Sequence, residues 1–179
     1  ILYGSWELSR LPERCDDCLE EINEIWAMSS FVDQMYLRST TLPVYVFQHP
    51  IVYDQLESWS RTQFKIPKNN FVFLFMFDFD SHVARKNPEA VIEAFKLAFK
   101  ESSNFSVILV IKTINGERHE KEWNHLKNKM TGDSRIIQIH KVLPHSANTA
   151  LMQCSDCYVS LHRSEGFGLT LAETMLMGK

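Results

Sequence analysis

Runs of consecutive apolar residues alternate along the chain with segments in which apolar residues recur every three to four positions. Four continuous runs, rich in β-branched and aromatic residues, predict strands at 71–77, 105–111, 135–139 and 157–161. Helical periodicity predicts helices between and after them, at 88–99, 117–130, 145–153 and 169–177. Strands that are apolar throughout are typical of a parallel sheet covered on both faces. The pattern therefore predicts an α/β fold built from βαβ units with right-handed crossovers.

The first fifty residues show a shorter alternation of the same kind. It predicts a strand at 1–6, an acidic helix at 12–23, a strand at 24–28, a helix at 30–37 and a strand at 43–47. His49 and Pro50 then interrupt regular structure, because the residue before a proline disfavours the helical region. We place a domain boundary near 48–52, which divides the chain into residues 1–50 and 51–179.

Composition narrows the class of protein. Of the 179 residues, 45% are hydrophobic and 23% are charged, as in ordinary globular proteins. The formal net charge of −3 argues against bulk electrostatic binding of nucleic acid, although a local basic cleft stays open. No apolar run reaches the ~18 residues that span a bilayer, and no signal peptide is recognised. Because the chain starts within a predicted strand and without Met, we interpret it as a fragment of a longer protein.

Four cysteines form two pairs with metal-ligand spacing, Cys15 with Cys18 and Cys154 with Cys157. The pairs are more than a hundred residues apart, whereas the ligands of a compact zinc module lie much closer in sequence. We therefore favour reduced cysteines in a cytosolic chain over a shared metal site, and we expect no metal ion.

The predicted strand order locates a ligand crevice. If the four strands of 71–161 follow the Rossmann order 3-2-1-4, the order reverses between the strands 71–77 and 157–161. Ligands of doubly wound sheets bind at such a point, beyond the carboxyl ends of the strands. The segments that leave these two strands, Asp78–Pro88 and His162–Gly168, carry a high density of charged residues and glycines.

These two segments have the composition of a site for a nucleotide sugar. Gly166 and Gly168 allow close approach of a ligand, and a helix that starts near Gly168 points amide groups at an anion. Glu165 and Glu173 flank that position, and carboxylates accept hydrogen bonds from sugar hydroxyls. A nucleoside diphosphate sugar has hydroxyl groups on both sides of its pyrophosphate. The alternatives are a plain turn for the glycines and an exposed helix acid for Glu173.

Two cations precede the helix that starts at Pro88. Arg85 and Lys86 lie in a predicted turn from which they can reach a pyrophosphate. The alternative is a solvated basic turn. For His162 and Arg163, at the end of the last predicted strand, packing at the edge of the core and contact with the donor both stay open.

The segment from Glu165 to Glu173 (EGFGLTLAE) resembles the E-x7-E motif of retaining glycosyltransferases with the GT-B fold, in the family called glycosyl transferases group 1. The stretch from Phe77 to Pro88 (FDFDSHVARKNP) is similar to the segment that carries the phosphate-binding lysine of these enzymes. Trp6, Glu7, the stretch around Trp26 to Phe31, and His49 with Pro50 resemble the end of the acceptor domain and the passage into the donor domain.

The resemblance implies roles for single residues. Glu165 contacts the donor sugar, Glu173 holds the ribose hydroxyls, and Lys86 neutralises the diphosphate, so that Glu165 and Lys86 are the catalytic candidates. The donor-binding candidates are Ser81, Arg85, Lys86, His162, Arg163, Glu165, Gly166, Phe167, Gly168, Leu169 and Glu173. Many members carry an arginine where this chain has Asp80 or Ser81, which makes Arg85 the candidate for that charge.

The resemblance further implies a metal-independent glycosyltransferase that moves a sugar from a nucleotide sugar to an acceptor with retention of configuration. The acceptor is a carbohydrate, a lipid-linked molecule or another compound. A non-catalytic nucleotide-sugar-binding module, and an epimerase or phosphorylase on the same fold, are the alternatives. We expect a cytoplasmic protein without a transmembrane segment; peripheral membrane contact through other parts of the protein stays open. Residues 1–50 correspond to the end of the acceptor-side domain and residues 51–179 to a truncated donor-side domain, so we expect this piece alone to be inactive.

Overall fold

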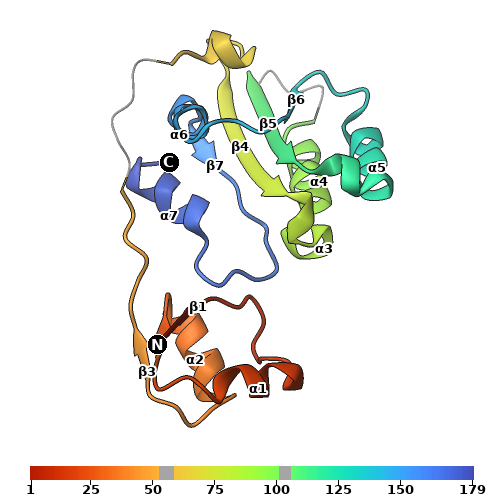
Figure 1. The fold of residues 1–179 in the computed structure, drawn as a ribbon. Helices are drawn as coiled ribbons and strands as arrows, with labels where there is room; N and C mark the ends of the chain where they lie inside the picture. Colours follow the sequence, from red (N-terminus) through yellow and green to blue (C-terminus); the bar gives the residue numbers. More distant parts are fainter. Residues whose placement is uncertain (53–58, 101–105) are drawn as a thin grey trace. The chain divides into compact units, whose positions relative to one another are not determined.

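The computed structural model describes residues 1–52, 59–100 and 106–179, which form two compact units. The first unit comprises Ile1–Val52 together with Ser164–Leu169, and the second comprises Tyr53–Arg163 and Thr170–Lys179. Each unit has its own parallel sheet and its own hydrophobic core (Figure 1). The assignment of residues 1–50 and 51–179 to acceptor-side and donor-side domains stays a prediction.

The first unit is built on a three-stranded parallel sheet in the order β1-β2-β3. Its strands are Leu2–Gly4, Ile25–Ala27 and Val44–Val46. Helix α2 (Ser30–Leu37) covers one face of the sheet, where Val32 and Met35 bury their side chains against β2. Ser29 begins this helix, because its hydroxyl accepts a hydrogen bond from the backbone amide of Val32.

The acidic helix predicted at 12–23 is much shorter than expected. The structure has a 3₁₀ turn at Glu13–Cys15 and a single α-helical turn, α1, at Asp16–Leu19. Two acidic residues, Glu20 and Glu21, follow at its carboxyl end, where the negative end of the helix dipole disfavours further carboxylates. The concentration of acidic residues is therefore consistent with the early end of the helix.

The second unit has a four-stranded parallel sheet in the order β6-β5-β4-β7. Its strands are β4 (Phe71–Asp78), β5 (Val107–Ile114), β6 (Ile136–His140) and β7 (Cys157–Tyr158). This is the predicted order 3-2-1-4, with the reversal beside β4. The prediction of a doubly wound α/β sheet is therefore confirmed.

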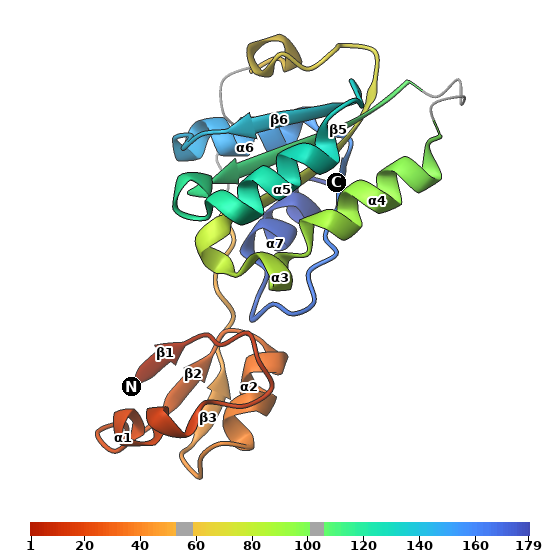
Figure 2. The same cartoon turned by 90° about the vertical axis from the view of Figure 1, so that its right-hand side faces the viewer.

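Helices cover both faces of this sheet, which explains why its strands are apolar throughout (Figure 2). On one face lie α4 (Pro88–Ala98) and α5 (Glu120–Met130), packed on Phe75 and Leu109. On the other lie α6 (His145–Cys154), packed on Leu74 and Val110, and α7 (Leu169–Leu176), which is followed by Met177 in the same cluster. The four predicted helices are thus present, with α5 shortened at its start by a 3₁₀ turn at Gly116–Arg118.

In the second unit, β5 and β7 depart most from their predicted bounds. β5 extends three residues past the apolar run, because Lys112 and Thr113 keep their backbone pairing with both β4 and β6. Its predicted start at residue 105 lies outside the described residues. β7 pairs with β4 at only two residues, Cys157 and Tyr158, since the chain then leaves the sheet.

Arg61 contributes to a group of polar contacts at the amino ends of β4 and β7. It lies in a 3₁₀ turn, Arg61–Phe64, that the sequence pattern did not reveal. Its Nε donates to the carbonyl of Cys154 at 2.9 Å, and its Nη2 lies 2.6 Å from the carboxylate of Asp156. That carboxylate also accepts the amide of Val72 in β4, at 2.7 Å. One partly buried ion pair therefore links this turn with β4 and the start of β7.

All four cysteines are free thiols, and burial raises the pKa of the Cys154 thiol. Among the described residues, no group of three potential ligands could hold a metal ion. The same part of the chain contains no helix that combines the length and the apolar character needed to cross a bilayer.

Candidate functional site

The chain that leaves β4 turns sharply at its carboxyl end. Asp78 caps a 3₁₀ turn, Phe79–Ser81, through a hydrogen bond from the amide of Asp80 to its Oδ1. His82 follows with φ 58°, a conformation that is uncommon for residues other than glycine. Arg85 and Lys86 then lie in the last turn of a short helix, α3 (Val83–Lys86). The turn predicted for these two cations is a single helical turn in the structure, because the amides of both bond back to the carbonyl of His82.

Hydrogen bonds join this segment to the segment that leaves β7. Asn87, which ends α3 with φ 54°, donates from Nδ2 to the carbonyl of Leu161 at 3.0 Å. The amide of Arg163 donates to the carbonyl of Arg85 at 2.9 Å, and its guanidinium donates to the carbonyl of Ala84. The two segments singled out in the sequence therefore meet beyond the carboxyl ends of β4 and β7.

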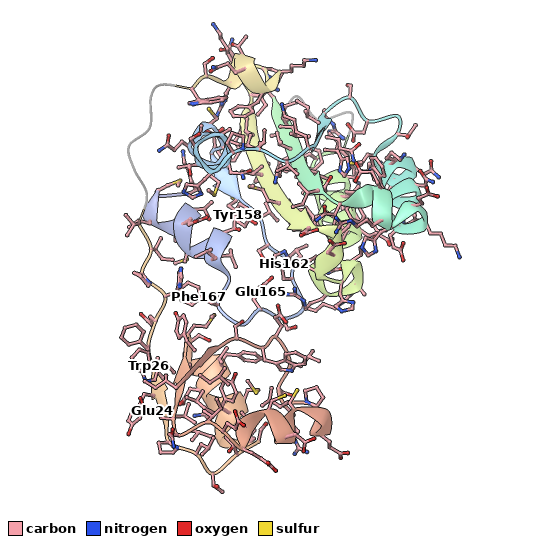
Figure 3. All side chains as sticks on the ribbon, viewed as in Figure 1. Glu24, Trp26, Tyr158, His162, Glu165 and Phe167 are labelled. Atoms are coloured by element: carbon pink, nitrogen blue, oxygen red, sulfur yellow. The ribbon has the colours of Figure 1, made fainter. Side chains whose placement is uncertain are left out.

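Three donor-binding candidates near this meeting point differ in their contacts and their burial. Arg163 fixes carbonyl groups of α3, which is a structural role whether or not it also contacts a ligand. His162 is half-buried, with its ring edge-on to Phe75 at a centroid distance of 5.6 Å (Figure 3). Ser81 ends the 3₁₀ turn and is half-buried. The donor contacts expected of these three residues stay predictions.

The loop Ser164–Leu169 is part of the first unit. Gly166 is buried there, and its carbonyl accepts a hydrogen bond from the hydroxyl of Ser29. A Cβ atom at Gly166 would lie 2.7 Å from Oγ of Ser5 and 3.1 Å from the carbonyl of Trp6, so this position needs glycine. Phe167 contacts the ring of His49 edge-on, with centroids 6.3 Å apart. Glu165 is half-buried in the same loop.

Helix α7 starts directly after this loop. Gly168 has φ 77°, in the left-handed region that favours glycine, and Leu169 is the first residue of the helix. Glu173 is the fifth residue of α7 and half-buried. Of the two acids in the motif, Glu165 therefore belongs to the first unit and Glu173 to the second. The roles of Glu165 and Glu173 in donor binding stay predictions.

Polar side chains at the carboxyl ends of β4, β5 and β6 were missed in the sequence. Asp78 accepts a hydrogen bond from Nδ2 of Asn115 at 2.8 Å. Thr113 is fully buried, and its hydroxyl lies 2.7 Å from Nδ1 of His140. The signal that could have found them is the change from apolar to polar residues at the end of each run. These residues form a bonded polar layer at the edge of the sheet where the ligand is expected.

Lys112 lies next to this polar layer in β5 and is unusual because it is a buried lysine. It is only 6% exposed, and its ammonium group forms no hydrogen bond or ion pair with the described residues. Burial lowers the pKa of its ammonium group, and the negative charge of Asp78 partly offsets this effect. A lysine that is buried in this way costs stability when it is charged.

Asp80 and Ser81 are the two positions at which the family resemblance implies an arginine, and Asp80 is itself paired with cations. Its carboxylate lies 2.8 Å from the guanidinium of Arg118 and 2.8 Å from Nε2 of His119. The hydrogen bond from His119, with the charge of Arg118, lowers the pKa of Asp80. Arg118 comes from the 3₁₀ turn Gly116–Arg118 after β5 and supplies a cation beside Asp80.

A cavity of about 680 Å³ lies beside α3, in the second unit. Its charged and titratable lining residues are Asp80, Glu89, Glu93, Glu122, His82, His119 and Arg163. Arg85 and Lys86 do not line it. The cavity is therefore lined by both acidic and basic residues, among them one donor-binding candidate.

Comparison of the sequence with models of protein families identifies the family of the chain. A family model described as glycosyl transferases group 1 matches residues 59–179, more than half of the chain. The chain belongs to this family. The match includes both segments that meet at the carboxyl ends of β4 and β7. No curated protein is significantly similar to the chain.

Solved structures of glycosyltransferases share its fold. The Anabaena protein HepE, in complex with UDP and glucose, has a TM-score of 0.65 at 16% identity over 88% of this chain and 43% of HepE. A UDP-forming trehalose-phosphate synthase from Burkholderia xenovorans has a TM-score of 0.64 at 12% identity, over 87% and 44% of the two chains. A trehalose-6-phosphate structure from E. coli with bound UDP-2-fluoro glucose gives 0.62 at 12% identity, over 92% and 46%.

These likenesses show the fold of this group 1 glycosyltransferase chain. It is an α/β fold of the GT-B type with parallel sheets and helices on both faces, as expected. The chain spans less than half of the length of each of these structures.

The buried position of Lys112 predicts a specific dependence of stability on pH. Its pKa is lower in the folded protein than in the unfolded chain, so the unfolded state binds more protons between those two values. The free energy of unfolding of the wild type, relative to Lys112→Met, should therefore rise as the pH is raised toward 10.5, the ordinary pKa of lysine. Urea denaturation from about pH 7 to about pH 10 measures this difference.

The matched control is Lys121→Met, because Lys121 is an exposed lysine in the same unit. Its curve should run parallel to that of the wild type. A constant difference between wild type and Lys112→Met over the whole pH range would contradict a depressed pKa for Lys112.

Proposed function

We propose that this protein transfers a sugar from a nucleotide-sugar donor to an acceptor, with retention of configuration at the anomeric carbon. The observation that carries the proposal is the meeting of the two charged segments beyond β4 and β7, joined by the hydrogen bonds of Asn87 and Arg163. That meeting point is where the strand order β6-β5-β4-β7 reverses. In doubly wound sheets, such a position binds the nucleotide.

The charges near this point suit a pyrophosphate. Arg85 and Lys86 supply two cations from the last turn of α3. In the proposal, Lys86 neutralises the diphosphate as it leaves the sugar, and the first amides of α7 add hydrogen bonds. Glu173 would accept bonds from the ribose hydroxyls, and Glu165 would contact the donor sugar. Family membership and the UDP, glucose and UDP-2-fluoro glucose bound in the structural neighbours support this assignment.

A non-catalytic nucleotide-sugar-binding module is the main alternative, since the same contacts would hold a donor without transferring its sugar. An epimerase or a phosphorylase on the same fold would also use them. The difference lies in whether any contact becomes stronger in the transition state than with the bound donor, because only such a contact accelerates the reaction.

We expect donor binding without a divalent metal ion, because two side-chain cations and the amino end of a helix can take the place of the ion at the diphosphate. Calorimetric titration of the full-length protein with UDP and with UDP-glucose should give the same affinity in EDTA as in magnesium or manganese. Binding that disappears in the chelator and returns with either metal would contradict this proposal.

Substitution of Lys86 tests the diphosphate contact. A hydrogen bond from a charged donor contributes ~1.5–3 kcal/mol, so Lys86→Ala should weaken UDP binding by about ten- to a hundredfold. The melting temperature should stay close to that of the wild type, because Lys86 is only half-buried. Lys121→Ala is the control, with an exposed lysine, and should leave the affinity unchanged. Unaltered UDP affinity of Lys86→Ala would place the phosphate contact elsewhere.

Substitution of the two glutamates of the motif should affect nucleotide binding and turnover differently. Glu173→Gln should raise the dissociation constant of the nucleotide by about tenfold, because the ribose is held equally in the ground state and the transition state. Glu165→Gln should lower kcat on the order of a hundredfold with little change in donor affinity, if its contact strengthens as charge develops on the sugar.

Steady-state kinetics and direct donor binding by both variants separate enzyme from binding module. Losses confined to KM in both variants would indicate that the acids only position the ligand. A wild type that binds donor but neither transfers nor hydrolyses it, with any acceptor class, would favour the binding module.

A further inference from the structure

The loop that carries Glu165 is held by a side chain more than a hundred residues away in sequence. The hydroxyl of Ser29 donates a hydrogen bond to the carbonyl of Gly166. The same hydroxyl oxygen accepts the amide of Val32, at 3.2 Å, and so caps α2. A serine hydroxyl has one proton to donate and lone pairs to accept with, so both bonds form at once.

The surroundings of Gly166 leave little freedom to this part of the loop. Gly166 is buried in the first unit, and a Cβ atom there would lie 3.5 Å from Val32 as well as within 3.1 Å of Ser5 and Trp6. The carbonyl that accepts the bond from Ser29 belongs to the residue directly after Glu165. This carbonyl lies in the peptide plane that joins Gly166 to Phe167, so the bond fixes the backbone one peptide unit beyond the one that joins Glu165 to Gly166.

We propose that Ser29 is a positioning residue that holds the backbone of Gly166, and thereby Glu165, in place for the reaction. The inference rests on the proposed function, in which Glu165 contacts the donor sugar. Ser29 acts through the loop and touches no reacting atom. A misplaced catalytic group lowers the rate of reaction more than it lowers the affinity for substrate, since alignment matters most in the transition state.

The amino end of α2 is a stable point of attachment. Val32 and Met35 of α2 are buried in the core of the first unit, and the extended backbone of Ser29 (φ −154°, ψ 164°) directs the cap. The hydrogen bond from Ser29 thereby attaches the loop to a helix that is packed in the core. Loss of one neutral hydrogen bond of this kind increases local opening by roughly two- to tenfold.

Three variants separate positioning from stability. Ser29→Thr keeps a hydroxyl that can cap and donate. Ser29→Ala removes both bonds. Ser39→Ala is the matched control, because the Ser39 hydroxyl also makes one donated and one accepted bond, to the carbonyl of Met35 and from the amide of Leu11, at the other end of α2. The two alanine variants should lower the melting temperature by similar amounts.

The first measurement is amide hydrogen exchange of residues 164–169 in the ligand-free full-length protein. Exchange of this loop should be faster by roughly two- to tenfold in Ser29→Ala, and unchanged in Ser39→Ala and Ser29→Thr. This result does not depend on any enzymatic activity. Equal exchange of the loop in Ser29→Ala and wild type would overturn the proposal.

The second measurement is steady-state kinetics with UDP-glucose as the donor. Ser29→Ala should lower kcat with little change in the KM for donor, Ser29→Thr should restore it, and Ser39→Ala should match the wild type. Faster loop exchange without a loss of kcat would make Ser29 a structural contact only and refute its role in the reaction. If the wild type shows no transfer at all, the proposed function fails, while the exchange experiment still decides whether Ser29 holds the loop.

Discussion

The parallel pairing of β4 with β5 on one side and with β7 on the other determines where the two charged segments of this chain meet. Because all four strands run in the same direction, every connecting segment leaves the sheet at its carboxyl edge and returns by way of a helix. β4 is the strand at which the order reverses, so the segments that leave β4 and β7 diverge to opposite faces. Only at this edge do they start side by side, and the hydrogen bond from Asn87 to Leu161 fixes that arrangement.

Most of the second unit could be predicted because its strands are buried on both faces. A continuous apolar run of seven or eight residues, as in β4, has few alternatives, and its length agrees with the structure almost to the residue. The same criterion failed at the end of β5, where Lys112 and Thr113 are polar and yet buried. Backbone pairing to two neighbouring strands overrides side-chain polarity there. Local patterns also gave no sign of α3, which lasts a single turn and has no buried residue.

The candidate site was predicted less completely, for a reason of topology. A sequence motif such as EGFGLTLAE reads as one unit, with two acids eight positions apart. In the structure, Glu165 lies in a loop that packs within the first unit, whereas Glu173 lies on a helix of the second. Spacing along the chain cannot show this division. It also cannot show Ser29, whose contact with Gly166 joins positions 137 residues apart.

The two glycines of the motif illustrate the same limit at a smaller scale. In the sequence, Gly166 and Gly168 suggest a single tight turn. In the structure, Gly168 is required by its backbone conformation, with φ 77° directly before α7. Gly166 is required by space, because Ser5 and Trp6 leave no room for a Cβ atom. A conformational requirement is local and could be met in an isolated peptide, but a requirement for space exists only once the first unit has folded around the loop. The loop that carries Glu165 therefore depends on the correct packing of residues from the beginning of the chain, and this dependence makes the motif a product of the tertiary fold rather than of its own nine residues.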